Sequence, residues 1–465
     1  MRLLHSWRTD GAVFDDENLV SCAGLIPVMA LAEQSGLSQL LEDHVRFTDE
    51  RIRSGGANPA GKLTAVIAGL TAGADSIDDL QVVRSGGMKK VFGSVYAPST
   101  LGIHLREFTH GHVRQLDAVL TRHLLALAGR TELLKGIEVQ ARVDVDSLLR
   151  PVYGHQKQGA SFGHTKIANR QVLRKGLSPL AVTISTPAAA PVIAAVRLRA
   201  GRAGSGKGAA GIVVQAINTA KKAGATNILA RGDSAYGNSD VIGAVVKIGA
   251  TFSFVLTKNQ SVNQAIAVIA DNAWTPVHYP GAVEDPDTGE LISDAQVAEI
   301  RYTAFASTKG QVTARLIVRR VKDRNHLDGW FPVWRYHPFF TDNTEPVAQA
   351  DITHRQHAIV ESVFADLING PWANIPSSRF PSNAAWTVLA AITHNLLRAA
   401  GTIAAPHLGK ARGATLRRQL INVPARTARP QGRPTLHLPQ HWPHATSWKR
   451  LWDNICNGPP PPLVA

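Results

Sequence analysis

Residues 142–149 read RVDVDSLL, and in this stretch Asp144 and Asp146 alternate with Val143 and Val145. Side chains at alternate positions of a β-strand share a face, so both carboxylates are expected on one side and both valines on the other. A carboxylate in an otherwise apolar strand is costly to bury unless it is paired or bound to a metal. The stretch therefore predicts a strand with one chemically unusual face.

Short β-rich runs surround this stretch, and helical runs separate the later ones. Strands are predicted at 137–145, 181–185, 192–199, 228–231 and 252–256, and helices at 209–223 and 240–248. Such alternation is typical of an α/β fold whose sheet has mixed strand direction.

The first part of the chain has a different texture, with apolar residues at helical spacing between positions 20 and 135. This spacing predicts a helical N-terminal domain over 1–135, in which Ser99 caps a helix at 100–108. The next helix begins near Thr109, so the pair could form a helix-turn-helix that binds DNA, although adjacent helices are common without that role.

The remaining chain divides by composition and pattern. The predicted order is a first core part at 136–258, a β-rich insertion at 259–345, a second core part at 346–400 and a basic, Pro-rich tail at 401–465. Helices are expected within the second core part at 353–367 and 384–400.

Charge is distributed unevenly along the 465 residues, whose formal net charge is +15. Residues 367–465 hold 11 Lys and Arg but one acid, Asp453, and seven of these cations lie between Lys410 and Arg433. A run of cations without internal partners favours a polyanion, and nucleic acid is the obvious one. The alternative is a solvated tail without a ligand. Two adjacent cations of this run are candidate phosphate contacts, Arg417 and Arg418.

Cysteine usage and hydropathy exclude other classes of protein. The two cysteines, Cys22 and Cys456, lie far apart, which excludes a disulfide framework and a thiolate metal cluster. No stretch reaches the roughly 18 to 20 apolar residues of a membrane span. We therefore expect a soluble, unsecreted protein without a membrane partner.

Two further acids stand in suggestive places, Asp233 in ARGDSAYGN and Glu361 in HRQHAIVESVFADL. Asp233 follows a short apolar strand, where α/β sheets place their ligands. His354 and His357 precede Glu361 by seven and four residues, so one continuous helix would carry all three on one face. Three carboxylates suit a pair of Mg²⁺ ions that transfers phosphoryl groups, whereas each acid alone could equally be a turn or capping residue.

Four blocks in this order carry a family resemblance: VDVDSLLRPVYGHQ, ARGDSAYGN, HRQHAIVESVFADL and FPSNAAWTVLAAITHNLLRAAG. They resemble DDE transposases of bacterial insertion sequences, in the group with a long insertion before the Glu. The resemblance implies an RNase H-like mixed sheet flanked by helices. It also implies two Mg²⁺ ions, for which Mn²⁺ should substitute, and cleavage of DNA followed by strand transfer. The implied partners are double-stranded DNA, as element ends and target, and further copies of the chain in the bacterial cytoplasm at the nucleoid.

The resemblance assigns roles to individual residues. Its catalytic, metal-binding acids match Asp146, Asp233 and Glu361, with Asp144 as the alternative to Asp146. Related enzymes place Tyr and Arg before the Glu to contact phosphate, and here those positions are His354 and His357, with Arg355 beside them. Some relatives stack a flipped base on a Trp of the insertion, for which Trp330 and Trp334 are hypothetical counterparts beside a plain core role.

Two rival interpretations remain. GRAGSGKG at Gly201–Gly208 fits the G-x-x-x-x-G-K pattern between a predicted strand and helix, which would suggest a P-loop NTPase. Gly208, however, stands where the Ser or Thr that binds Mg²⁺ is required, so a flexible connection near DNA is the simpler interpretation. The other rival is a non-catalytic or inactivated DNA-binding protein, which would explain the basic tail without the acids.

Overall fold

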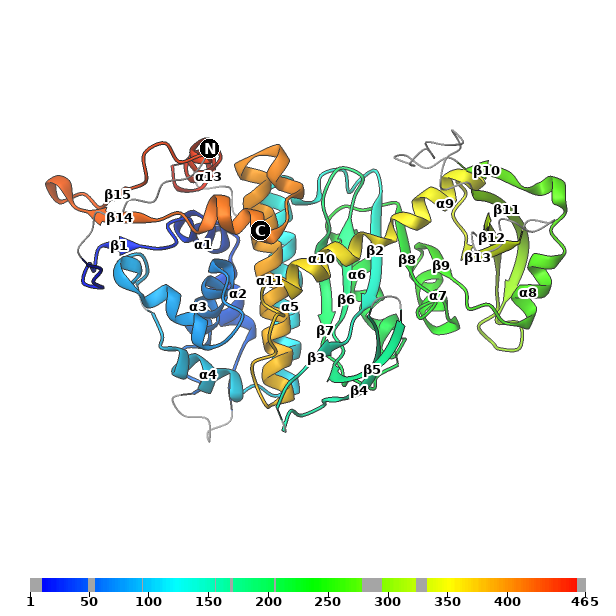
Figure 1. The fold of residues 1–465 in the computed structure, drawn as a ribbon, viewed down its shortest axis with the longest axis horizontal. Helices are drawn as coiled ribbons and strands as arrows, with labels where there is room; N and C mark the ends of the chain where they lie inside the picture. Colours follow the sequence, from blue (N-terminus) through cyan, green and yellow to red (C-terminus); the bar gives the residue numbers. More distant parts are fainter. Residues whose placement is uncertain are drawn as a thin grey trace.

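The structure, a computed structural model, describes residues 11–48, 55–93, 95–154, 156–167, 170–204, 206–277, 295–322 and 333–457. An elongated molecule results, with helices at one end and a large sheet running through the centre to the other end (Figure 1). The sheet has nine strands in the order β10-β11-β12-β13-β9-β8-β2-β6-β7.

Five strands and two helices belong to the segment predicted as the first core part. They are β2 (Ala141–Ser147), β6 (Leu180–Ser185), β7 (Val192–Arg197), α6 (Ala209–Lys222), β8 (Ile228–Gly232), α7 (Ser239–Lys247) and β9 (Thr251–Val255). β2, β6 and β7 form an antiparallel meander, whereas β8 runs parallel to β2 and β9 parallel to β8. The predicted α/β fold with an RNase H-like mixed sheet is thereby confirmed, with every predicted strand within a few residues of its place.

The described residues of the segment predicted as a β-rich insertion extend the same sheet. The segment's elements are α8 (Gln260–Ala267), β10 (Thr275–Val277), β11 (Ala295–Ala304), β12 (Val312–Lys322) and β13 (Trp334–Thr341). β13 pairs with β9 over Phe339–Thr341, so the insertion is continuous with the core through backbone hydrogen bonds.

The described part of residues 1–135, predicted as a helical domain, contains five α-helices: α1 (Leu25–Gln34), α2 (Leu37–His44), α3 (Pro59–Ala72), α4 (Pro98–Arg106) and α5 (His110–Arg130). The expected N-cap of α4 was wrong, because the helix begins at Pro98 after Ala97 and thus includes Ser99. Proline suits the first helical position, since its missing N–H would have no partner there. Thr109 caps α5, whose apolar face packs along α11.

Helix α11 (Phe380–Ala404) joins the helical domain to the sheet and is longer than predicted. Most of its residues are buried, and they lie on every face of the helix, which is typical of a helix at the centre of a large protein. The Asn395 side chain accepts a hydrogen bond from the Ile193 amide and donates one to the Ile193 carbonyl, both at 2.8 Å. Both backbone groups of Ile193, in the edge strand β7, thereby have hydrogen-bond partners. Within the described ranges, no helix is both long and apolar enough to cross a membrane.

The basic segment after α11 folds back onto the N-terminal helices, which the prediction of a separate tail missed. β14 (Ala425–Ala428) pairs with β1 (Leu19–Val20) and β15 (Thr435–His437), and α13 (Ala445–Cys456) packs on α1 and α11. The predicted Pro-rich end, Pro459–Pro462, lies outside the described residues. The remaining short elements are α12 (Gly413–Leu416), a π turn at Arg417–Ile421 and 3-10 turns at Asp78–Arg84, Gly86–Lys90, Glu132–Leu134, Asp271–Ala273, Pro406–Lys410 and Pro430–Gly432.

A small second sheet leaves the core between β2 and β6 and was not predicted. It consists of β3 (Arg150–Pro151), β4 (Ser161–Ile167) and β5 (Arg170–Leu177) in the order β3-β5-β4. Its sequence is polar and Gly-rich, without the clear apolar alternation that marks a half-buried strand.

A buried histidine in α5 makes stability depend on pH. Burial lowers the pKa of His123 from 6.5 to about 4, so the folded protein keeps the ring neutral while the unfolded chain protonates it. Because the folded pKa is depressed, this contribution is present above about pH 6.5 and is lost as the pH falls toward 4. Between pH 7 and pH 5 the free energy of unfolding of the wild type should fall by about 2 kcal/mol more than that of His123→Gln. Buried His104 and His394, whose pKa values are also lowered, contribute equally in both proteins. An equal fall in the two proteins, measured by chemical denaturation, would contradict the assignment.

Candidate active site

The register of two parallel strands brings the first two predicted acids to one edge of the sheet. Asp144 on β2 lies opposite Arg231 on β8, and Val145 lies opposite Gly232. One residue further along both strands stand Asp146 and Asp233. This is the carboxyl edge of the parallel pair, where α/β sheets bind ligands.

The charge environment of Asp146 connects it with both other acids. Burial, as the largest cause, and the negative charges of Asp233 and Glu361 raise the pKa of Asp146 to about 7, while the Ser147 amide and the Arg199 charge act in the opposite direction. The Ser147 N–H donates to Asp146 Oδ1 at 2.6 Å. Asp233 itself is exposed and accepts a hydrogen bond from the Ala235 amide at 2.9 Å. Asp233 and Glu361 therefore both lie within electrostatic reach of Asp146.

Glu361 lies in the first turn of α10 (Ile359–Ile368) and is exposed, whereas Val360 and Val363 face the core. The predicted continuous helix over 353–367 was wrong: α9 (Val347–Arg355) ends, a 3-10 turn spans Gln356–Ala358, and α10 then begins. The break changes the helical phase, so His354 and His357 do not share the face of Glu361 that the spacing predicted.

His354 points into the protein. Its ring is buried, its Nδ1 lies 2.8 Å from Ser253 Oγ, and it stacks on Phe339 with ring centroids 4.2 Å apart. Burial, followed by nearby positive charge including His357 and Arg231, lowers its pKa well below 6.5 and keeps it neutral. A phosphate contact through this ring is therefore not favoured, while Arg355 is exposed and His357 half-buried.

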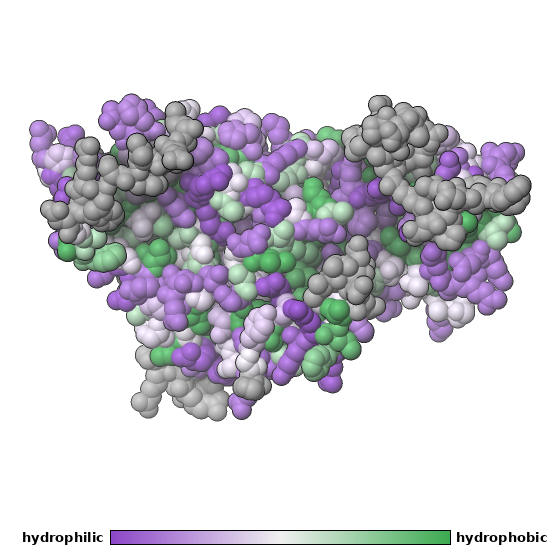
Figure 2. All heavy atoms as spheres, viewed as in Figure 1, coloured by the Kyte–Doolittle hydropathy of each residue, from purple (hydrophilic) through white to green (hydrophobic). Residues whose placement is uncertain are grey.

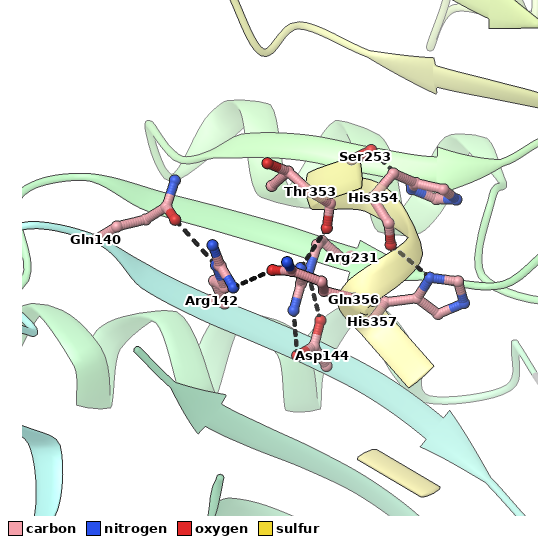
Figure 3. A network of polar contacts seen from close by, with 9 residues as sticks. All are labelled: Gln140, Arg142, Asp144, Arg231, Ser253, Thr353, His354, Gln356 and His357. Carbon is pink, nitrogen blue, oxygen red and sulfur yellow. Dashed lines mark hydrogen bonds and ion pairs between the residues drawn. The ribbon is translucent and has the colours of Figure 1, made fainter. Parts of the chain in front are cut away.

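Asp144, the alternative metal ligand, is engaged elsewhere. Arg231 and Asp144 are fully buried and form a bidentate ion pair, with Nε–Oδ1 at 2.7 Å and Nη2–Oδ2 at 2.8 Å (Figure 3). Both carboxylate oxygens are thus used by the guanidinium. The structure therefore favours Asp146 over Asp144 as the first acid of the site.

The same arginine joins the two strands to the helical segment that carries Glu361. Arg231 Nη1 donates to the Thr353 carbonyl at 2.5 Å, in the last turn of α9. Arg142 Nη1 donates to Gln356 Oε1 at 2.5 Å in the 3-10 turn, and His357 Nδ1 donates to the His354 carbonyl at 2.7 Å (Figure 3). Carbonyls at a helix end lack helical partners, so these donors fix the end of α9. The network thereby sets the place from which α10 begins.

Sequence reasoning missed Arg231, although a signal was present. Asp144 and Arg231 are 87 residues apart, the same separation as Asp146 and Asp233. Equal separations place both pairs of residues opposite each other on two parallel strands. Asp144 and Arg231 then lie within the sheet, and Asp146 and Asp233 lie two residues further on, at its edge.

The Gly-rich stretch at Gly201–Gly208 is a packing feature and not a phosphate loop. A Cβ on Gly201 would come within 2.2 Å of the Ser161 carbonyl oxygen, so only glycine allows β4 to approach. Arg199 donates to the carbonyls of Gly204 and Lys207 at 3.3 and 3.1 Å. Carbonyl oxygens converging on a cation have the opposite polarity to the amides that cradle phosphate.

The candidate phosphate contacts in the basic segment differ from each other. Arg417 is buried and donates to the carbonyls of Thr71 and Leu70 at 3.3 and 3.4 Å, which caps the end of α3. Its predicted DNA contact is therefore replaced by a structural role, whereas Arg418 is exposed. Arg412 likewise pairs with buried Asp366 at 2.5 Å, so part of the predicted surplus of positive charge is neutralised inside the fold.

The tryptophans proposed for base stacking receive no direct support. Trp330 lies outside the described residues. Trp334 is half-buried and carries Arg320 over its ring at 4.4 Å, and the same guanidinium lies 4.2 Å from the Trp274 ring. This sandwich fits the plain packing role.

The donor set fits a hard divalent cation in its chemistry, because all three groups are carboxylates. In the part of the chain that the structure describes, no three or more His, Cys, Asp or Glu side chains are already gathered closely enough to hold a metal ion. Asp146 lies in β2 and Asp233 directly after β8, whereas Glu361 stands at the start of α10.

Comparisons with known proteins complete the description. The family described as Transposase DDE domain group 1 matches residues 10–459. No curated protein matched the sequence. Among solved structures, the piggyBac transposase synaptic complex with hairpin DNA is similar with a TM-score of 0.41 and 12% identity, over 97% of this chain and 84% of that chain. At this distance the likeness carries no argument about the site.

Proposed function

The chain belongs to the family of transposases with a group 1 DDE domain, and from this membership we propose that it cleaves and joins DNA strands at Asp146, Asp233 and Glu361. The observation that carries the assignment is the register of β2 and β8, which brings Asp146 and Asp233 to one edge of the sheet, where burial and the charges of Asp233 and Glu361 raise the pKa of Asp146. The substrates are the two ends of an insertion sequence and a target DNA.

DDE transposases generally use divalent metal ions, and three carboxylates offer the hard oxygen ligands that Mg²⁺ prefers. Bound between them, two Mg²⁺ ions would lower the pKa of the attacking water or 3′-hydroxyl and stabilise the leaving oxygen. Mn²⁺ has the same ligand preference and is expected to substitute.

The protein's own residues supply position and charge. β2 and β8 hold Asp146 and Asp233 on rigid neighbouring strands, and the Arg231 network positions the helix of Glu361. The raised pKa of Asp146 means that its proton must leave before the carboxylate can act as a ligand. Among the candidate phosphate contacts, Arg355, His357 and Arg418 remain proposals because their side chains reach the surface wholly or in part.

Strand transfer needs both element ends in one complex, so we include a homo-oligomer on DNA in the proposal. The alternative is a non-catalytic or inactivated DNA-binding protein, in which the positive charge binds DNA and the three acids have no catalytic role. It predicts binding to the element ends with no cleavage.

The test uses a labelled duplex that carries the element's flanking ends. The wild-type protein should cut at the ends in Mg²⁺ and in Mn²⁺, leave 3′-hydroxyls, and join them to a second duplex. Chelation with EDTA should abolish both steps and leave DNA binding intact. Binding without cleavage in either metal would favour the alternative, and cleavage that persists in EDTA would contradict the metal mechanism.

A further inference from the structure

The small sheet between β2 and β6 rises from the same edge as Asp146. Its base is closed where Ser147 pairs with Leu180 and where the Leu148 amide donates to the Pro179 carbonyl at 3.2 Å. Residues 148–179 therefore leave the core directly after the candidate catalytic strand and return beside it. The base of the small sheet therefore lies beside the strand end that carries Asp146.

The two faces of the β4–β5 pair are unlike. Gly163 and Gly176 lie on the inner face, where an added Cβ would come within 2.2 Å of the Gly201 carbonyl oxygen and 2.4 Å of the Arg150 carbonyl oxygen. At these two glycines the inner face is closed by backbone, that of Gly201 after β7 and that of Arg150 in β3. Two glycines at such contacts fix the orientation of the sheet, so the opposite face points to solvent.

Side chains of the outer face combine apolar and basic groups. Phe162 lies opposite Lys175 and His164 lies opposite Leu173, and residues directly opposite in an antiparallel pair share a face. Phe162 and Leu173 are 65% and 59% exposed, and His164 and Lys175 are exposed as well. In Figure 2 hydrophobic atoms gather at the surface over β4 and β5. Large apolar groups left in water beside cations mark a binding surface.

Charge identifies the partner. Between the two aspartates of the site, Ser147–Gly232 contains 13 Lys and Arg and no Asp or Glu. Exposed Lys175 lies opposite Phe162 on the outer face. A polyanion with apolar parts meets both features, because cations neutralise its phosphates while Phe and Leu contact its sugars and bases.

We propose that the outer face of the β4–β5 sheet, formed by Phe162, His164, Leu173 and Lys175, binds the DNA that enters the candidate active site. The proposal rests on the function proposed above, because it names a contact surface for the same substrate. A second copy of the chain would also cover apolar groups, but it would have to supply acids to match the cations here. DNA supplies the negative charge along its whole length.

The experiment measures affinity for a labelled duplex of random sequence between 50 and 300 mM KCl by fluorescence anisotropy. Each lost phosphate contact should reduce the magnitude of the slope of log K against log salt by about 0.9. The variant Lys175→Gln should therefore reduce this magnitude by about 0.9. The variant Phe162→Ser/Leu173→Ser should weaken binding about tenfold with little change in slope.

The matched control is Val246→Ser/Lys247→Gln, an exposed apolar and basic pair at the end of α7. α7 begins after the carboxyl end of β8 and ends before β9, so this pair lies at the opposite edge of the sheet. The control should bind as wild type. Wild-type affinity and slope in both hairpin variants would overturn the proposal.

Sedimentation of the same proteins tests whether a second copy of the chain, instead of DNA, covers this face. If the Phe162→Ser/Leu173→Ser variant loses self-association and keeps its DNA affinity, the face belongs to a second copy and the proposal is wrong. Cleavage of element ends is measured in parallel. Wild-type protein that binds DNA through this face and does not cut would contradict the proposed chemistry and leave the surface assignment standing.

Discussion

Replacing Asp146 by Asn should reduce cleavage of element ends by about 10³-fold or more while leaving DNA binding within a few-fold of wild type. The Asn side chain keeps the size of the carboxylate but loses the charge, and charge stabilisation by a bound metal contributes several kcal/mol to such reactions. Asp233→Asn and Glu361→Gln should behave in the same way. Labelled-strand cleavage under single-turnover conditions gives the rates.

Asp240→Asn is the matched control for this series. Asp240 is an exposed acid in the first turn of α7, seven residues after Asp233, and lies outside the proposed trio. It should cut at the wild-type rate. Wild-type cleavage by any of the three trio variants would remove that residue from the site, and equal loss in Asp240→Asn would point to a general effect of charge.

Arg231→Met should lower the free energy of unfolding by about 3–5 kcal/mol, because it leaves the Asp144 carboxylate buried without its partner. The double variant Asp144→Leu/Arg231→Met should recover most of this loss, since replacing a buried pair with apolar residues of similar volume is often neutral. Urea denaturation measures the three proteins. The exposed pair Lys135–Glu132 is the control, and Lys135→Met should cost less than about 1 kcal/mol.

The double variant also separates stability from positioning. Its fold should be restored, but the Thr353 carbonyl no longer receives the Arg231 hydrogen bond, so Glu361 loses part of its support. We expect cleavage by the folded double variant to stay well below wild type. Full activity would show that the Arg231 network stabilises the fold without positioning the helix, and a double variant as unstable as Arg231→Met would contradict the ion-pair account.

Local pattern predicted the strands of the core because each is a compact apolar run between turn residues. β6 and β7 are buried along almost their whole length, and Val143 and Val145 mark β2 clearly. The family resemblance then indicated which three acids form the site, because the separations along the chain alone select no trio from the 35 acids.

Long-range pairing was harder to predict than local structure. The break between α9 and α10 is held by Arg231, 122 residues away from the carbonyl it binds, and no helical pattern records such a partner. The sequence likewise predicts a free tail for the basic segment, because Asp366, which neutralises Arg412, lies on α10, and the carbonyls that accept hydrogen bonds from Arg417 lie on α3. The periodicity of apolar residues does not indicate which polar groups tertiary contacts will bury.

Metal binding by the DNA complex tests most directly whether the three carboxylates form one site. Electron paramagnetic resonance should count Mn²⁺ bound to the wild-type protein on a duplex carrying an element end, and Asp146→Asn, Glu361→Gln and Asp240→Asn should be measured beside it. We predict that the wild type and Asp240→Asn retain Mn²⁺ and that the other two lose it. Undiminished Mn²⁺ in both trio variants would contradict the assignment of Asp146 and Glu361 to a shared metal site.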